Sequence, residues 1–259
     1  MSFIAPRTVQ VILGTPIVAG NGALYTVDYF RQCYDRLNEN GIFSTWLPVY
    51  DLRAVDFKVI LNSLCEVFPY VYLWHTSIGR NEWTIVHGFK RELILDFAQL
   101  ETKISQKKVK DDLEQIYIRN PIDILSLFLM PKTRIKTYIS GLEILNTDDN
   151  AYIEFIPARY AASGTRLILF REAFAELVHY RVPAIPIIAF PPKDQNELME
   201  KYKNAYYSMT AVLRGRLYEM WGDRDIAEEQ FRHAIKLYAG NYVAKDLLGI
   251  LKENKQAVI

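Results

Sequence analysis

The first ninety residues alternate between strand-like and helix-like patterns of hydrophobic and polar positions. Val9 to Gly14 is a short apolar run that ends in a loop rich in glycine, proline and asparagine, and Tyr25 to Leu37 then places apolar residues at helical spacing. A second apolar run, from Gly41 to Pro48, is followed by a second helical pattern from Val55 to Val67. We therefore expect two strands that alternate with two helices.

Two further strand-like runs follow, Tyr70 to Trp74 and Trp83 to Gly88, joined by a polar loop. The order β-α-β-α-β-β fits a mostly parallel sheet that ends in a hairpin. Ligands bind beyond the carboxyl ends of the strands in open α/β sheets, but the glycine-rich turn that holds a nucleotide cofactor normally follows an earlier strand. We therefore expect this chain to carry half of an active site.

From Arg91 to Pro192 the pattern changes to short helices broken by prolines, clearest at Lys107 to Tyr117 and Pro121 to Met130. A polar turn, Asn146 to Asn150, precedes the strand-like stretch Ala151 to Pro157. We expect this irregular helical segment to pack onto the sheet rather than to fold alone.

The chain is helical again from Asn196 to its end. Small, aromatic and turn residues lie here at the spacing of one tetratricopeptide repeat of roughly 34 residues, namely Gly215, Tyr218, Gly222, Ala227, Phe231 and Ala234. One repeat cannot bury its own apolar face, so the helix from Asn241 is expected to be a cap or the start of a further repeat. A plain helical hairpin is the alternative. The patterns thus predict three regions, residues 1–90, 91–192 and 193–259.

Composition narrows the class of function. The 259 residues include 31 basic and 30 acidic side chains, so no long-range field favours nucleic acid or an anionic membrane surface. Cys33 and Cys65 lie in predicted helices, as buried thiols do in a reducing compartment. The apolar stretch 182–192 is interrupted by four prolines, and no charged leader with an apolar core opens the chain. We expect a cytoplasmic chain without a membrane segment or a nucleic-acid partner.

A metal site has little support. The four histidines show no ligand spacing, and the two cysteines form no C-x-x-C pair. Lysines at positions 103, 107, 108 and 110 interleave with acidic residues, which is typical of a solvated helix face and not of a phosphate-binding patch.

Several stretches resemble the carboxyl-terminal half of spermidine synthase-like proteins: residues 22–30 (GALYTVDYF), 37–48 (LNENGIFSTWLP), and 55–57 with 66–69 (VDF and EVFP). Residues 145–149 (LNTDD) and 152–159 (YIEFIPAR) are similar to the tail of a bacterial subgroup in which this domain is fused to membrane segments and to tetratricopeptide repeats. The resemblance spans Val9 to Arg159.

This resemblance implies a partial Rossmann-like sheet of the S-adenosylmethionine methyltransferase type that lacks its first strands, with Val9 to Leu13 as the fourth strand. It also implies polyamine biosynthesis: transfer of an aminopropyl group from decarboxylated S-adenosylmethionine, the family co-substrate, to a diamine. No cofactor is expected in this chain, and the adenosyl-binding half is expected from an amino-terminal segment or a second subunit. The cytosolic part of a membrane-fused parent is the alternative to a free cytoplasmic protein.

Aminopropyl transfer requires carboxylates, because two cationic partners must be held and the incoming ammonium must lose a proton. Family members carry the catalytic acid in the loop after the fourth strand, where this chain has Gly14 to Val18 without an acid. We therefore assign no catalytic residue and expect the chain to be inactive alone.

The candidate substrate-binding residues are Thr15, Asn21, Trp46, Tyr50, Asp51 and Trp83. Trp46, Tyr50 and Asp51 lie at the carboxyl end of the second strand, where an aromatic face and a carboxylate suit an amine. The resemblance implies a role for Trp83, which matches the place of a glycine-tryptophan turn near the diamine pocket of the synthase family. Packing at the sheet rim or in the hairpin core is the alternative for the aromatic residues. The sequence Gly20-Asn21-Gly22 is a poor dinucleotide turn, because Tyr25 replaces the third glycine. For Asp148 and Asp149 we favour local backbone bonding in a turn over substrate contact.

Two functions therefore remain open. The first is one half of an aminopropyltransferase, and the second is a non-catalytic interaction protein whose helical tail binds a protein partner. A fragment, or a reading frame with a misplaced start, is a third alternative.

Overall fold

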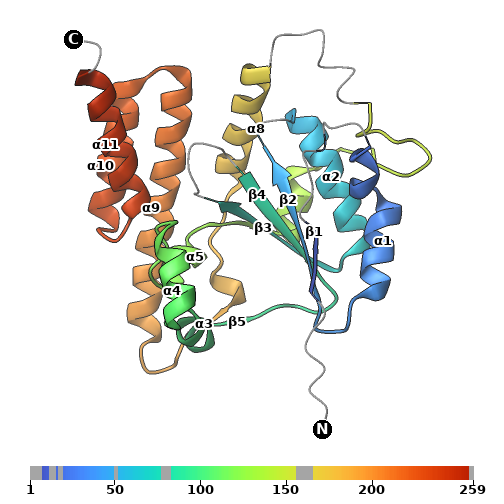
Figure 1. Cartoon of the computed structure of the whole chain (residues 1–259), viewed down its shortest axis with the longest axis horizontal. Helices are drawn as coiled ribbons and strands as arrows, with labels where there is room; N and C mark the ends of the chain where they lie inside the picture. Colours follow the sequence, from blue (N-terminus) through green and yellow to red (C-terminus); the bar gives the residue numbers. More distant parts are fainter. Residues whose placement is uncertain are drawn as a thin grey trace. The chain divides into compact units, whose positions relative to one another are not determined.

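The computed structural model describes residues 8–11, 16, 20–49, 52–76, 83–155 and 166–256. These residues form a mixed α/β structure, as expected (Figure 1). The chain divides into two compact units, one from residues 1–93 and 129–182, the other from residues 94–128 and 183–259. The expected division into residues 1–90, 91–192 and 193–259 stays a prediction.

The first unit is built on a sheet of five strands in the order β1-β2-β4-β3-β6. The strands are β1 (Thr8–Val11), β2 (Ile42–Pro48), β3 (Tyr70–Thr76), β4 (Trp83–Phe89) and β6 (Phe128–Pro131). β1 pairs with β2 in parallel, whereas β4 pairs antiparallel with both β2 and β3. Three strands, β1, β2 and β3, thus run in one direction, and β4 runs in the other between two of them.

The expectation of a mostly parallel sheet is therefore wrong for the pairing of the strands. β3, the first strand of the hairpin, does not pair with β2. The second strand, β4, pairs with β2 instead, so β3 lies one strand further along the sheet. A sequence pattern predicts strand directions along the chain, but it does not state which strand becomes the neighbour of which.

Two helices pack on one face of the sheet, α1 (Val27–Arg36) and α2 (Ala54–Val67) (Figure 1). The Phe43 ring lies between those of Phe30 and Phe68, with ring centroids 5.6 and 5.1 Å away. Gly88 on β4 leaves the space for this cluster, since a Cβ there would lie 2.5 Å from the Phe68 ring. Helices α6 (Lys132–Tyr138) and α8 (Arg166–Tyr180) also belong to this unit.

Two predicted elements of the middle segment are wrong. The helix expected from Pro121 to Met130 ends at Leu125, and β6 begins at Phe128. The strand expected from Ala151 to Pro157 is a turn in its described part, residues 152–155. No neighbouring strand is needed for its described amides: Asn150 and Asn146 accept hydrogen bonds from the amides of residues 152 and 153, and the amides of residues 151 and 154 donate to local backbone carbonyls.

The second unit is mainly helical. It contains α3 (Phe97–Ile104), α4 (Lys107–Glu114), α5 (Pro121–Leu125), α9 (Gln195–Trp221), α10 (Arg224–Leu237) and α11 (Tyr242–Gln256), with the short parallel pair β5 (Leu95–Asp96) and β7 (Ile188–Ala189). Helices α9 and α10 form an antiparallel hairpin in which Gly215 lies against Phe231, where a Cβ would come within 2.4 Å of the ring. The hairpin agrees with the small–aromatic spacing of the sequence, while its assignment as a tetratricopeptide repeat stays a prediction.

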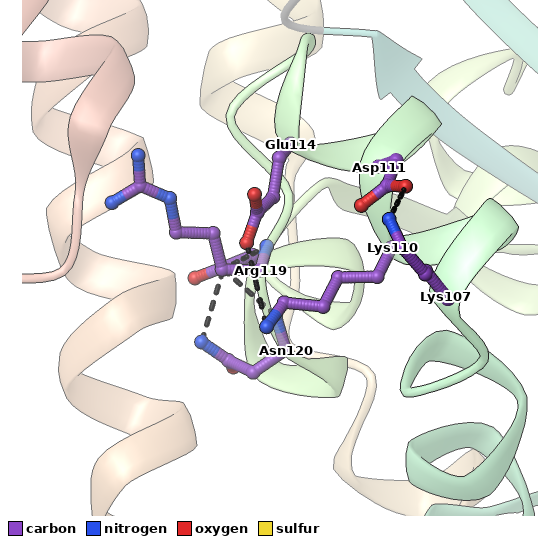
Figure 2. Close-up of polar contacts among 7 residues, drawn as sticks. Lys107, Lys110, Asp111, Glu114, Arg119 and Asn120 are labelled. Atoms are coloured by element: carbon purple, nitrogen blue, oxygen red, sulfur yellow. Dashed lines mark hydrogen bonds and ion pairs between the residues drawn. The ribbon is translucent and has the colours of Figure 1, made fainter.

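The charged residues of α4 pair along the helix. Lys107 Nζ lies 2.7 Å from Asp111 and Lys110 Nζ lies 3.8 Å from Glu114, each one turn apart (Figure 2). These side chains are exposed. Lys107 and Lys110 therefore belong to ion pairs within α4 on a solvated face.

Within the described part of the chain, no helix is both long enough and apolar enough to span a membrane.

Candidate functional site

The first unit contains a cavity of about 420 Å³ at the amino-terminal end of α1. One wall is the short helix η1 (Gly22–Tyr25) with the first turns of α1, and the other is the segment 147–154. Its polar lining residues are Thr26, Tyr29, Gln32, Thr147, Asp148 and Glu154. Two segments that lie more than a hundred residues apart in the sequence therefore form one concave surface.

Glu154 fixes the wall that precedes α1. Its Oε1 accepts a hydrogen bond of 2.6 Å from the amide of Gly20, and its Oε2 accepts one of 3.1 Å from the amide of Gly22. A Cβ at Gly22 would lie 2.7 Å from the Glu154 amide nitrogen, and Gly20 has a φ of +89°. Both glycines are therefore required by geometry, one by close approach and the other by its backbone conformation.

Asn146 connects the other wall of the cavity, residues 147–154, to the turn at Gly20 to Gly22. Its side chain is fully buried; Nδ2 donates to the carbonyl of Gly22 over 3.1 Å, and Oδ1 accepts from the amide of Ile153 over 3.0 Å. Its carbonyl accepts from Val27, the first residue of α1, and its amide donates to Ser63 Oγ on α2. One side chain and its peptide groups thus join three elements.

The turn after Asn146 is closed by its own side chains. Thr147 and Asn150 exchange two hydrogen bonds between side chain and backbone, of 3.1 and 3.2 Å. The amide of Asp148 donates to Asp28 Oδ2 on α1 over 2.9 Å. Thr147 and Asn150 thus carry the side-chain bonds of this turn, and Asp148 is also one of the residues that line the cavity. The expectation of local bonding for the side chains of Asp148 and Asp149 stays a prediction.

A buried carboxylate ties this segment to α2. Asp56, in the first turn of α2, is fully buried and accepts two hydrogen bonds from the Arg53 guanidinium, at 2.8 and 2.9 Å. The hydroxyl of Tyr152 donates to the same carboxylate over 3.1 Å. The sequence did not lead us to predict this group of Arg53, Asp56 and Tyr152. The spacing of three between Arg53 and Asp56 at the start of a helix is visible in the sequence, but nothing local indicates Tyr152 as a partner.

Two of the predicted site residues contact each other. Trp46, near the carboxyl end of β2, packs edge-to-face on Trp83, the first residue of β4, with ring centroids 5.3 Å apart and an angle of 80°. Tyr25 donates from its hydroxyl to the carbonyl of Trp46 over 3.3 Å. Both tryptophans are half-buried. Their role in binding a substrate stays a prediction, and the pairing agrees equally with the packing alternative.

The other predicted residues divide into two groups. Asn21 precedes η1, and its carbonyl accepts from the amide of Leu24 over 3.0 Å. Thr15, Tyr50 and Asp51 lie outside the described residues. Sequence reasoning did not single out Glu154 or Asn146 as site residues, although both belong to the stretches that carry the family resemblance.

The charges of the cavity favour a cation. Among its described lining residues are two carboxylates, Asp148 and Glu154, and no basic side chain. Burial raises the pKa of Tyr29 above its usual range, so this phenol stays neutral at physiological pH. The described residues contain no cluster of three His, Cys, Asp or Glu side chains arranged to hold a metal ion. The arrangement suits an organic ammonium group better than an anion.

The chain is similar to part of several enzymes. It is 32% identical over 117 residues to the polyamine aminopropyltransferases of Thermotoga petrophila, Thermotoga neapolitana and Thermotoga maritima; each match covers 42% of this chain and 39% of the relative. The chain thus spans well under half the length of the curated relatives it matches. No protein-family profile matches it, and no solved structure gives a significant match. These similarities establish a distant, spermidine synthase-like relationship to polyamine aminopropyltransferases.

Proposed function

We propose that this chain contributes the amine-binding part of a spermidine synthase-like site. The observation that carries the proposal is the cavity between η1–α1 and residues 147–154, which is lined by Asp148 and Glu154 in a chain related to polyamine aminopropyltransferases. In this function, decarboxylated S-adenosylmethionine is the aminopropyl donor and a diamine is the acceptor. The adenosyl-binding part comes from an amino-terminal segment or from a second subunit.

The carboxylate of Asp148 supplies the charge that a diamine needs. Glu154 already receives two backbone hydrogen bonds, so its charge is partly neutralised by the amides of Gly20 and Gly22. Asp148 is exposed and lies on the same cavity wall. Tyr29 adds a neutral hydroxyl and a ring face, both of which attract an ammonium group.

The proposal assigns no residue of the described part of the chain to the chemical step. A general base must lie close to the amine that loses its proton, and we assign none of the described residues to that role. The loop from Gly14 to Val18 contains no acid. We therefore propose that catalysis requires the adenosyl-binding part as well as this chain.

Calorimetric titration with putrescine tests the proposal. The folded chain is expected to bind putrescine, and D148N is expected to bind it up to about five times more weakly, because an exposed charge pair contributes up to about 1 kcal/mol. D149N is the matched control, since Asp149 is exposed in the same turn but does not line the cavity. Equal affinities of D148N and the unmodified chain, or no binding by the latter, contradict the proposal.

A second function is favoured by one observation. Tyr207 and Trp221 on α9 are 57% and 48% exposed, and tyrosine and tryptophan are enriched among the residues that contribute most to protein interfaces. In this alternative the helical tail of the second unit is the binding module. The calorimetric experiment separates the two functions, because a well-folded chain that binds no diamine favours the interaction function.

A further inference from the structure

We propose that Glu154 is a positioning residue: its carboxylate is the built-in anion of a backbone nest formed by the amides of Gly20 and Gly22. A nest is a turn whose backbone N–H groups converge on one anion, as they do around phosphates in nucleotide-binding proteins. Here the anion belongs to the same chain. The residue acts through the turn at positions 20–22 and not on a substrate.

The geometry is that of an occupied anion site. The two carboxylate oxygens are divided between the two amides, at 2.6 and 3.1 Å. Gly20 adopts the left-handed conformation, which glycine reaches without steric cost. Gly22 has no space for a Cβ beside the backbone of Glu154. The turn Gly20-Asn21-Gly22, whose sequence partly matches a dinucleotide-binding motif, therefore binds the carboxylate of Glu154.

The carboxylate is held in place from its own side as well. Asn146 bonds to Gly22 and Ile153, and Tyr152 bonds to the buried Asp56. Glu154 therefore enters the nest from a segment with several anchors, which reduces the entropy lost when its side chain is ordered. The segment 146–154 works as a strap across the turn that precedes α1.

The strap sets the shape of the cavity. Gly20 and Glu154 both line it, so release of Glu154 moves one wall relative to the other. This consequence for ligand binding rests on the proposed amine-binding function, whereas the nest itself does not. The two can be tested separately because one readout needs no amine.

Nuclear magnetic resonance of the full chain with ¹⁵N-glycine gives that readout. The chain has 12 glycines, so the amides of Gly20 and Gly22 can be followed individually. In E154A, hydrogen exchange at these two amides is expected to rise by about tenfold or more, because hydrogen bonds to a charged group are the stronger ones. D149N is the control, and exchange at Gly20 and Gly22 is expected to stay unchanged in it.

Rescue by a small anion distinguishes a nest from ordinary packing. Formate added to E154A is expected to restore slow exchange at Gly20 and Gly22, while chloride at the same ionic strength is not. E154Q keeps the size of the side chain but offers one accepting oxygen, so it is expected to protect one amide only. E154Q also serves as the test if E154A does not fold.

Unchanged exchange in E154A and E154Q overturns the proposal, and so does fast exchange that formate fails to slow. Putrescine binding is a second measurement, and its result is interpreted separately from the hydrogen exchange. Weaker putrescine binding by E154A that formate restores shows that the nest positions the cavity wall. Absence of putrescine binding by the unmodified chain defeats the proposed function and leaves the nest to be decided by exchange alone.

Discussion

The hydroxyl of Tyr238 donates a hydrogen bond of 3.0 Å to Asp123 Oδ1, a residue 115 positions earlier in the sequence. Asn120 donates from Nδ2 to the same hydroxyl over 3.2 Å, and Asp123 Oδ2 accepts from the amide of Arg119 over 2.8 Å. The Arg119 guanidinium lies 3.3 Å from the ring centroid of Tyr242. The helical tail and the segment 94–128 are therefore parts of one folded unit, although residues 129–182, which belong to the first unit, separate them in the sequence.

Removal of this hydroxyl is expected to destabilise the second unit. Tyr238→Phe keeps the ring but leaves Asp123, which is mostly buried, with one donor fewer, at a cost of about 1–3 kcal/mol in the free energy of unfolding. Urea denaturation followed by circular dichroism measures it. Tyr207→Phe is the control, because Tyr207 is exposed, and its stability is expected to match that of the unmodified chain. Equal midpoints for both variants contradict the role of the Tyr238 hydroxyl.

The elements of the first unit were predictable where the pattern is local. Helix α2 was expected from Val55 and begins at Ala54, and β3 was expected from Tyr70 and begins there, because apolar spacing and the flanking Pro69 act within a few residues. The neighbour relations of β4 were not predictable, since they depend on contacts between distant residues. The turn at 151–155 was misassigned for the same reason, because Asn146 provides a bond that no local propensity reveals.

The contact between two candidate site residues could not be predicted. Trp46 and Trp83 were proposed separately, one from each of two strands, and their rings meet because β4 pairs with β2. Glu154 was not expected, since a single acidic residue in a strand-like stretch carries no signal for its partners Gly20 and Gly22 more than 130 residues earlier. Long-range polar contacts of this kind require the fold.

Asn146 is expected to be the most sensitive polar residue of the strap. Asn146→Ala leaves the carbonyl of Gly22 and the amide of Ile153 without their side-chain partners at a fully buried position, which is expected to cost about 2–4 kcal/mol. Urea denaturation measures the loss. Asn204→Ala, at an exposed position of α9, is the control and is expected to leave stability unchanged or slightly higher. A loss below about 1 kcal/mol for Asn146→Ala shows that the two groups find other partners.

Two glycines with opposite surroundings test the close approach of the strap. Gly22→Ala places a Cβ 2.7 Å from the backbone of Glu154, so the strap must shift, and a loss of about 1–3 kcal/mol is expected. Gly249→Ala, inside α11, meets nothing within 4 Å and is expected to stabilise the chain by up to about 1 kcal/mol. Thermal or urea unfolding compares the two. A neutral Gly22→Ala means that the contact with Glu154 is not tight in solution.

His87 is expected to make the stability of the sheet depend on pH. It lies on β4 opposite Ser44 and Tyr72, and burial lowers its pKa to about 4, whereas an unfolded chain has a histidine pKa near 6.5. The unfolded state therefore binds a proton more readily than the folded state between these values. The stability that comes from the neutral imidazole is complete above about pH 6.5 and is lost as the pH falls towards 4, by roughly 1–3 kcal/mol.

The comparison of His87→Gln with the unmodified chain isolates this contribution from that of the carboxylates, which titrate in both proteins. Between pH 7 and pH 4.5, the urea midpoint is expected to fall further in the unmodified chain than in His87→Gln, because the glutamine does not gain a proton. His233→Gln, at an exposed position of α10, controls for the loss of a histidine as such and is expected to behave like the unmodified chain. Parallel declines in the unmodified chain and His87→Gln mean that the imidazole is protonated in the folded sheet without penalty, so the half-exposed face of β4 admits enough water to solvate the charge.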